Sequence, residues 1–317
     1  MGIVGLFADQ PQDPGLVPPH HLLGTLPRRL GAFFIDAIIL AIPGNIIGMV
    51  FFDYLSGLGS SGALVGFFLA LPYFAIFNSD IGNGQTPGKR LLRLQVVDKD
   101  GKTIPFTSSV ARYSVFAVPY CISDIVLLTT HTPWFISTLV YLVVYGVGGA
   151  TLYLVLFNRH TRQGLHDLAV GSYVADFGGT GPLRISPIWR LHWAIFASLL
   201  LVLVVGGQIL EHSWGSFPQM AADLRLLEDT KGVQSAGVQD MASWSQGGKK
   251  RTLVVNIRWT GGSRDESAFA DQIARIILEH DPTVTERDML RINMIRGYDL
   301  GIAHGQISRP YEHSPAE

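Results

Sequence analysis

Asp36 is the most chemically unusual residue of the chain, because it lies inside the apolar run of residues 31–42. A carboxylate in hydrocarbon costs roughly 2.5 to 3.5 kcal/mol, so it is kept where it is paired, hydrated or needed. Arg29 precedes it by seven residues, nearly two helical turns, which puts both on one helix face with the acid about 10 Å deeper. We expect an inward-facing pair that either binds a cation or fixes helix register.

Asp124 is the second acid that the sequence places in an apolar segment, residues 111–128, which also carries Arg112 and Pro119. In the bundle interior it would join Arg29 and Asp36 in binding an ion. The segment could instead lie in the membrane interface as an amphipathic helix, with Asp124 facing water.

Two loop motifs carry further polar chemistry. Residues 82–90 end in Gly88-Lys89-Arg90, a glycine-rich run that invites a phosphate-binding interpretation. The glycine spacing is wrong for a P-loop, and Arg90 stands where Ser or Thr would hold magnesium. The alternation that follows, with Asp-Gly at a turn near residue 101, predicts a β-hairpin over residues 91–105 against the inner membrane face.

The second motif is the His166-Asp167 pair, within residues 159–174. A histidine next to an aspartate suggests proton transfer or a metal, although such a dipeptide more often makes a hydrogen bond within a loop. The sequence predicts neither a catalytic constellation nor a cofactor or metal site.

The composition indicates the elements that must position these residues. Charged residues make up 15% of the chain, against roughly 25% in soluble domains, and the last 107 residues contain 15 of the 25 acidic ones. We predict an α-helical membrane bundle of about five spans with a cytoplasmic β-hairpin, followed by a small soluble α+β domain. The spans are expected near residues 31–52, 62–78, 112–130, 134–157 and 188–210.

The basic residues predict the orientation. All twelve Lys and Arg residues of the membrane part lie before the first span, between the second and third, or between the fourth and fifth. Loops rich in these residues stay in the cytoplasm, so we expect a cytoplasmic N-terminus and an extracytoplasmic C-terminal domain. Small residues at Gly44, Gly48, Gly62 and Gly66 would let the spans pack closely on one another.

Three motifs together resemble the RDD family of bacterial inner-membrane proteins: Arg29 to Asp36, residues 84–98, and residues 162–174. The resemblance covers about residues 25–176. It implies that Arg29, Asp36 and a second acid, for which Asp167 is the best match, are the family's named residues. A role in sodium- or proton-coupled transport is implied for some members. Gly171-Ser172 stands where most relatives have Gly-Thr.

The resemblance and the composition together divide the chain into five parts: an N-terminal cytoplasmic segment (1–27), an RDD-like membrane domain (28–176), a linker (177–187), a fifth membrane helix (188–210) and a soluble domain (211–317). In the soluble domain, apolar spacing predicts helices over 216–231 and 263–280, the second with Ser263 as N-cap. Alternation predicts a hairpin and two further strands in a small antiparallel sheet.

Two functional classes remain open. The first is a proton- or sodium-coupled transporter in the bacterial inner membrane, with Asp36 and Asp124 as the carboxylates that bind the cation. The second is a non-catalytic adaptor, with Arg29 and Asp36 as a structural lock and a soluble tail that binds an extracytoplasmic partner. Either would contact the lipid bilayer and form a homo-oligomer or bind another membrane protein, and no contact with nucleic acid is expected.

Overall fold

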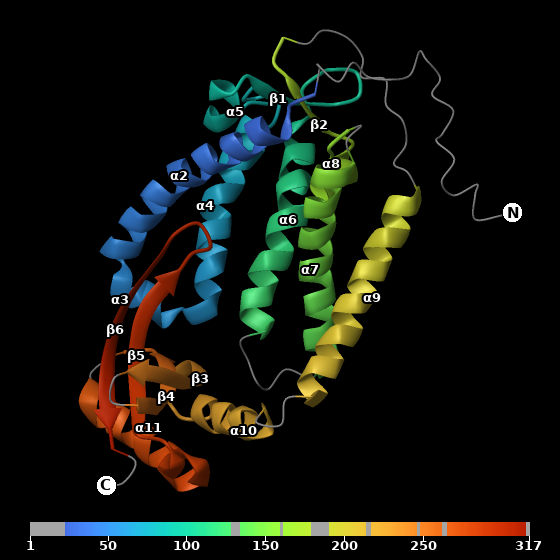
Figure 1. The fold of residues 1–317 in the computed structure, drawn as a ribbon. Coiled ribbons are helices and arrows are strands. Elements are labelled where there is room, and N and C mark those ends of the chain that lie inside the picture. The colour runs from blue at the N-terminus through green and yellow to red at the C-terminus, as the bar shows by residue number, and fades with distance from the viewer. Residues whose placement is uncertain are drawn as a thin grey trace, which may run out of the picture. The chain divides into compact units, whose positions relative to one another are not determined.

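Five long helices lie in the described residues up to position 213 of the computed structural model (Figure 1). They are α2 (Leu26–Val50), α4 (Gly62–Phe77), α6 (Phe106–Leu127), α7 (Trp134–Phe157) and α9 (Arg190–Ser213), and the short α3 (Phe52–Gly57) follows α2. The structure describes residues 23–127, 134–158, 161–178, 190–213, 217–245, 248–261 and 265–314. Ser263, the predicted N-cap, lies outside these residues.

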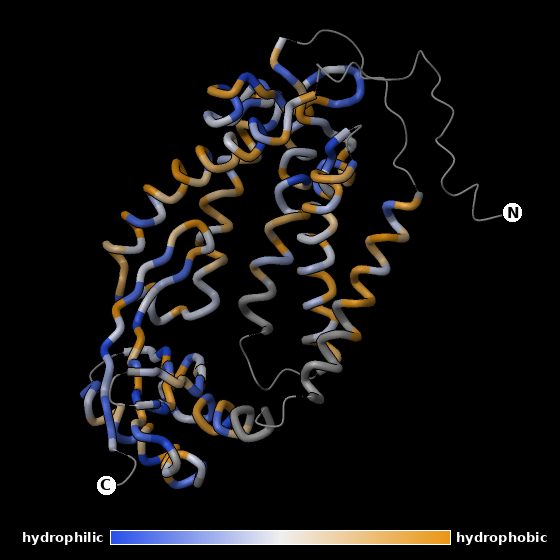
Figure 2. The backbone as a smooth tube through the Cα atoms, in the orientation of Figure 1, coloured by the Kyte–Doolittle hydropathy of each residue, from blue (hydrophilic) through white to orange (hydrophobic). Residues whose placement is uncertain are grey.

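Within the described residues, three stretches are long and apolar enough to cross a membrane: Leu26–Val50, Gly59–Phe77 and Thr138–Phe157. Hydrophobic residues prevail along α2, α4 and α7 (Figure 2). Large apolar side chains on α2 are exposed, for example Phe34 at 61% and Ile38 at 62%, as expected for helices that face lipid. Helices α6 and α9 have 22 and 24 residues, long enough to span, so the count of five spans stays a prediction.

A two-stranded sheet connects the loops at the N-terminal end of α2. Strand β1 (Leu94–Val97) pairs antiparallel with β2 (Tyr173–Asp176), and Val96 lies opposite Val174. The predicted hairpin over residues 91–105 is therefore wrong in its second strand, although the turn at Asp98–Gly101 is present. The segment after the turn instead buries Ile104 against β1 and leads into α6.

The C-terminal tail, described from residue 217 to residue 314 with two short gaps, is a four-stranded sheet with two helices packed on one face. Its elements are α10 (Phe217–Glu228), β3 (Val233–Ser245), β4 (Gly248–Trp259), α11 (Glu266–His280), β5 (Met289–Asp299) and β6 (His304–His313). The strand order is β3-β4-β5-β6, and β4 and β5 run parallel because α11 crosses between them. The sheet is therefore mixed, and the antiparallel prediction is wrong for this pair.

Alternating residues of the strands bury one face of the sheet. Leu253, Val255 and Ile257 of β4 pack with Ile273 and Ile277 of α11 in one apolar core. Asp265 caps α11 and accepts a hydrogen bond from the Ser267 amide at 3.0 Å. The residues between these buried positions point to the other face of the sheet, which is more polar. On that face the Asn293 side chain donates a hydrogen bond to that of Asn256 at 2.8 Å.

The chain divides into two compact units, one of residues 1–42, 67–123 and 134–206 and the other of residues 43–66, 124–133 and 207–317. The second unit joins the tail to the adjoining ends of α2 and α4. Residues 299–303, between β5 and β6, form the hairpin tip that makes this junction, and Leu300 and Ala303 are buried there with Leu55 of α3.

Glycines make that junction possible. A Cβ atom at Gly66 would collide with the Leu300 carbonyl oxygen, and one at Gly48 would collide with the Tyr298 ring. A Cβ at Gly44 would lie 2.8 Å from that of Ala303. The expectation that these glycines serve close packing between helices is therefore corrected, because the surface they leave open receives the hairpin tip.

Candidate functional site

Asp36 is buried at 1% exposure and uses both of its carboxylate oxygens. Its Oδ1 accepts hydrogen bonds from the Tyr73 hydroxyl at 2.8 Å and the Gly88 amide at 2.8 Å. Its Oδ2 accepts one from the Thr86 hydroxyl at 2.6 Å. Charge-assisted bonds of this kind are about twice as strong as neutral ones, so Asp36 ties α2 to α4 and to the loop at residues 86–88.

The local sequence of this loop explains how it meets the carboxylate. Thr86 is the N-cap of α5 (Pro87–Leu91), its hydroxyl accepts a hydrogen bond from the Lys89 amide at 3.2 Å, and Pro87 occupies the first helical position. A Cβ atom at Gly88 would lie 2.8 Å from Asp36 Oδ1. Glycine is therefore required at position 88 for the backbone to approach the acid.

Asp167 is the second buried carboxylate, at 1% exposure in the first turn of α8 (Leu165–Val170). Its Oδ1 accepts hydrogen bonds from Arg112 Nε at 2.8 Å and from the Ser172 hydroxyl at 3.1 Å. Arg112 Nη2 lies 2.7 Å from the same oxygen, and the Gly164 amide donates to Oδ2 at 3.3 Å. Burial opposes ionisation, yet the positive charge of Arg112 holds the pKa of Asp167 well below its usual range.

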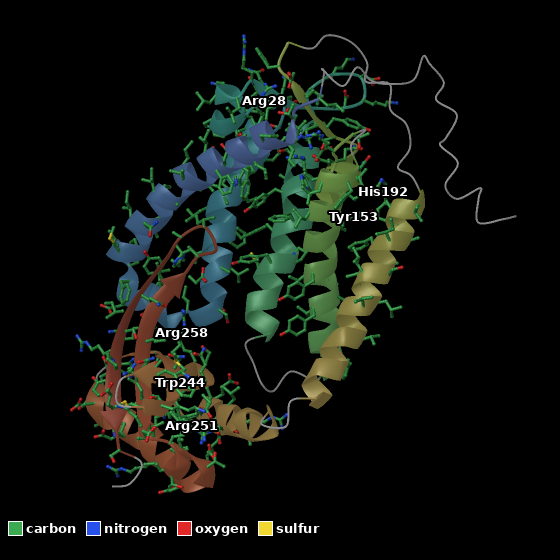
Figure 3. All side chains as sticks on the ribbon, viewed as in Figure 1. Arg28, Tyr153, His192, Trp244, Arg251 and Arg258 are labelled. Carbon is green, nitrogen blue, oxygen red and sulfur yellow. The ribbon has the colours of Figure 1, made fainter. Side chains whose placement is uncertain are left out.

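Arg29 and Asp36 do not bind each other. The Arg29 guanidinium donates to the carbonyl oxygens of Arg162 and, at 3.0 Å, of Val174. The prediction that Arg29 and Asp36 bind each other and fix helix register is therefore wrong. Arg29 donates to backbone carbonyls, and Asp36 accepts hydrogen bonds from a separate set of donors; the partners of both lie far away in sequence. The neighbouring Arg28 pairs with Asp176 at 2.8 Å, and its side chain is labelled in Figure 3.

Lys89 lies beside this network with a neutral partner. Its ammonium group donates to the Asn78 side-chain oxygen at 2.8 Å. Burial, reinforced by the positive charge of Arg112, lowers the pKa of Lys89 to about 7, although the charge of Asp36 opposes the shift. A substantial fraction of Lys89 is therefore uncharged near neutral pH.

His166 contacts Asp167 more loosely, with Nε2 at 3.5 Å from Oδ2. Burial lowers the pKa of His166 to about 4, although the charge of Asp167 raises it, so the ring is neutral at pH 7. Its edge faces Phe116 of α6 at a centroid distance of 6.5 Å. A neutral histidine beside an already paired acid fits a packed loop better than a proton relay.

The structure brings six residues into one group, which we call the cap cluster. Its members are linked by contacts or by electrostatic influence on one another: Arg29, Asp36, Lys89, Arg112, His166 and Asp167. Of the other predicted site residues, Arg90 is exposed on α5, and the side chain of Asp124, in α6, lies outside the described residues. In the part of the chain that the structure describes, no group of three His, Cys, Asp or Glu side chains could hold a metal.

Sequence reasoning missed Tyr73 and Ser172 and did not assign Thr86 or Arg112 to the site. The Thr86-Pro87 pair is an N-cap signature that could have identified Thr86. Arg112 lies in a long, mainly apolar helix, where a charged side chain requires a partner. This requirement could have predicted an ion pair between Arg112 and an acid elsewhere in the chain. Nothing local in the sequence singles out Tyr73.

Comparisons with known proteins find matches to the part of the chain that contains this site. Residues 23–171, slightly less than half of the chain, match the model of the RDD family. The chain is 26% identical over 146 residues to the uncharacterized protein YckC of Bacillus subtilis (strain 168), an alignment covering 46% of this chain and 80% of YckC. No solved structure matches.

Proposed function

We propose that this protein is a non-catalytic membrane adaptor, in which the RDD domain holds a rigid set of loops at one end of its helices and the tail binds a partner. The observation that carries the proposal is the set of three hydrogen bonds that Asp36 accepts. They make Asp36 a structural anchor for α5.

The geometry of Asp36 supports anchoring over ion binding. A hard cation is bound by oxygen lone pairs, and the Asp36 oxygens already accept hydrogens from Tyr73, Thr86 and the Gly88 amide. Three of the roughly four lone-pair sites of the carboxylate are thereby used, which leaves at most one for sodium. Asp167 is occupied in the same way by Arg112 and Ser172.

The tail supplies the surface for a partner in this proposal. Trp244 of β3 is 78% exposed and is labelled in Figure 3, and the Lys249 ammonium group lies 5.6 Å from its ring centroid. Exposed tryptophans with cationic neighbours are typical anchors of interfaces. By the distribution of basic residues we place the N-terminus in the cytoplasm and this tail outside a bacterial inner membrane.

A proton- or sodium-coupled transporter is the second candidate, and Lys89 favours it. A lysine whose pKa lies at about 7 exchanges its proton near neutral pH, and Asp36 is close enough to influence it. In this alternative, proton release from Lys89 would accompany cation entry at Asp36.

Proteoliposomes separate the two candidates. Purified protein would be reconstituted with a pH-sensitive dye inside, and sodium or potassium gradients would be applied to wild type and to Asp36→Asn, which keeps the shape of the side chain. The adaptor proposal predicts no cation-dependent pH change in either protein and a lower thermal stability for Asp36→Asn. Proton movement in wild type that is absent from folded Asp36→Asn would establish the transporter instead.

The adaptor proposal has a second requirement, which is that partner binding depends on the tail surface. Trp244→Ala should abolish co-purification of a specific membrane or extracytoplasmic partner while the protein stays folded. Ile307→Ala is the matched control, because Ile307 is also an exposed apolar residue of the tail sheet, at 56%, on a different strand.

A further inference from the structure

When Lys89 is protonated, the cap cluster holds three positive groups (Arg29, Lys89 and Arg112) and two negative ones (Asp36 and Asp167), and two of its cations have neutral partners. Arg29 binds two backbone carbonyl groups, and Lys89 binds the Asn78 amide oxygen. The two carboxylates are used elsewhere, Asp167 on Arg112 and Asp36 on uncharged donors. Buried or half-buried cations without an opposing charge are costly, so this arrangement favours an additional anion.

Three polar atoms near the cluster are buried and have no hydrogen-bond partner within the described chain: Arg29 Nε, His166 Nδ1 and Thr151 Oγ1. His166 and Thr151 both pack against Gly164, because a Cβ atom there would lie 3.0 Å from His166 Nδ1 and 2.8 Å from the Thr151 methyl carbon Cγ2. Buried polar groups in proteins nearly always have partners. Arg29 Nε–H and the Thr151 hydroxyl can donate to an oxyanion, whereas the Nδ1 of a neutral His166 whose Nε2 faces Asp167 is an acceptor.

The position of the cluster indicates where such an oxyanion comes from. Arg29 opens the apolar helix α2, and exposed apolar side chains lie at the same ends of the helices, with Leu30 at 45%, Phe106 at 41% and Phe157 at 58%. Cationic side chains at the ends of apolar helices lie at the depth of lipid headgroups. Phosphate groups are concentrated at that depth.

We propose that the cap cluster binds a phosphate-type oxyanion, the headgroup of an anionic phospholipid, through Arg29, Lys89 and the hydroxyl of Thr151. The bound phosphate compensates the excess positive charge and satisfies the unpartnered donors. Inorganic phosphate offers the same chemistry, and the experiment distinguishes the two sources. This site is independent of the adaptor proposal, because a transporter would need the same compensation.

The pH dependence follows from the groups around Lys89. Asp36 and Asp167 favour its charged form, whereas burial, Arg112 and Arg29 oppose it, and the net result is a pKa of about 7. A bound anion raises that pKa. Anion binding should therefore weaken as the pH rises above about 7 and Lys89 loses its proton.

The test uses the full-length protein in a zwitterionic detergent. Native mass spectrometry and thermal unfolding would follow titrations with dioleoylphosphatidylglycerol, dioleoylphosphatidylcholine and inorganic phosphate. Lys89→Gln removes a charge of the site and can still bond to Asn78. Arg90→Gln makes the same charge change at the adjacent, exposed position of α5 and serves as the control.

The expected result is selective binding of phosphatidylglycerol over phosphatidylcholine, weakened about tenfold by Lys89→Gln, the worth of one charge-assisted hydrogen bond, and less than twofold by Arg90→Gln. Phosphate binding with the same dependence on Lys89, and no selectivity between lipids, would keep the oxyanion site and assign it to the free ion. Equal binding of both lipids without phosphate binding, or equal weakening by both variants, would overturn the proposal. If Lys89→Gln does not fold, lipid selectivity in wild type and its decline between pH 7 and 9 decide the question.

Discussion

Replacing Asp167 by asparagine tests whether the charged network holds the loops to the membrane helices. The substitution keeps the size of the side chain and removes the charge opposite Arg112, whose side chain is only 10% exposed. It also places an amide NH₂ where Oδ2 accepts the Gly164 N–H, or leaves Arg112 facing a donor if the amide flips.

The expected loss of stability follows from the burial of the Arg112–Asp167 pair. Removing one partner of a buried ion pair costs about 3 to 5 kcal/mol, because the remaining charge stays buried without compensation. Asp176→Asn is the matched control, since Asp176 pairs with Arg28 at 2.8 Å but both side chains are 32% exposed. A half-exposed pair of this kind contributes about 0.2 to 1 kcal/mol.

The assay is unfolding of the full protein by SDS titration in mixed micelles, followed by circular dichroism. We expect a loss several times larger for Asp167→Asn than for Asp176→Asn, and a smaller loss for the double variant Arg112→Met with Asp167→Met, which leaves no buried charge at this pair. Equal losses for Asp167→Asn and Asp176→Asn would refute the reasoning.

The pH dependence gives an independent check of the same residue. Because the pKa of Asp167 is lower in the folded state than in the unfolded chain, its contribution is complete above the unfolded pKa and is lost as the pH falls through the folded one. The difference in stability between wild type and Asp167→Asn should therefore be constant near neutral pH and should narrow below about pH 4. A difference that does not change with acidification would contradict the ion-pair explanation.

Three further substitutions test the remaining contacts. Gly66→Leu should displace the Leu300 carbonyl and speed hydrogen exchange in the hairpin tip more than tenfold, whereas Gly148→Leu, at a glycine where an added Cβ atom would meet nothing within 4 Å, should leave exchange there unchanged. Thr86→Val removes an N-cap and a hydrogen bond to a carboxylate, and should lower the free energy of unfolding in the SDS titration by about 2 to 4 kcal/mol. Ile257→Ala, at a fully buried position of the tail core, should lower the stability of the tail by about 2 to 5 kcal/mol, measured as faster exchange throughout β4.

Local patterns in the sequence were enough to predict the long helices and to single out every residue of the cap cluster except Arg112. Asp36 stood out because a charge in an apolar run needs a reason, and the structure gives that reason as the anchoring of α5. The choice of partner was beyond local reasoning, since Asp36 binds residues 37 to 52 positions away and Arg29 binds carbonyls more than 130 positions away. Spacing of seven along one helix shows which face two residues share, and their partners are set by tertiary packing.

The strands show the same limit. The turn at Asp98–Gly101 followed from its residues, but β1 pairs with β2, nearly 80 residues later. Strand β2 begins with three buried residues in a row, residues 173–175, whereas the segment between the turn and α6 buries Ile104 alone. In the tail, the helix between β4 and β5 was itself a signal for a parallel pair, since a helical crossover returns the chain to the same end of the sheet. That topological rule would have corrected the antiparallel prediction.

The two buried acids of the cap cluster each attach a short helix to the long helices, with the acid on the long helix in one case and on the short helix in the other. Asp36 belongs to the long helix α2 and binds donors at the start of the short helix α5, whereas Asp167 belongs to the short helix α8 and binds Arg112 of the long helix α6. Each acid thus fixes one short helix, α5 or α8, to the bundle at a point where the backbone must leave the apolar region. Exchange of an ion at either acid would release the helix that it holds. The cost of that release is the strongest physical argument for an anchoring role.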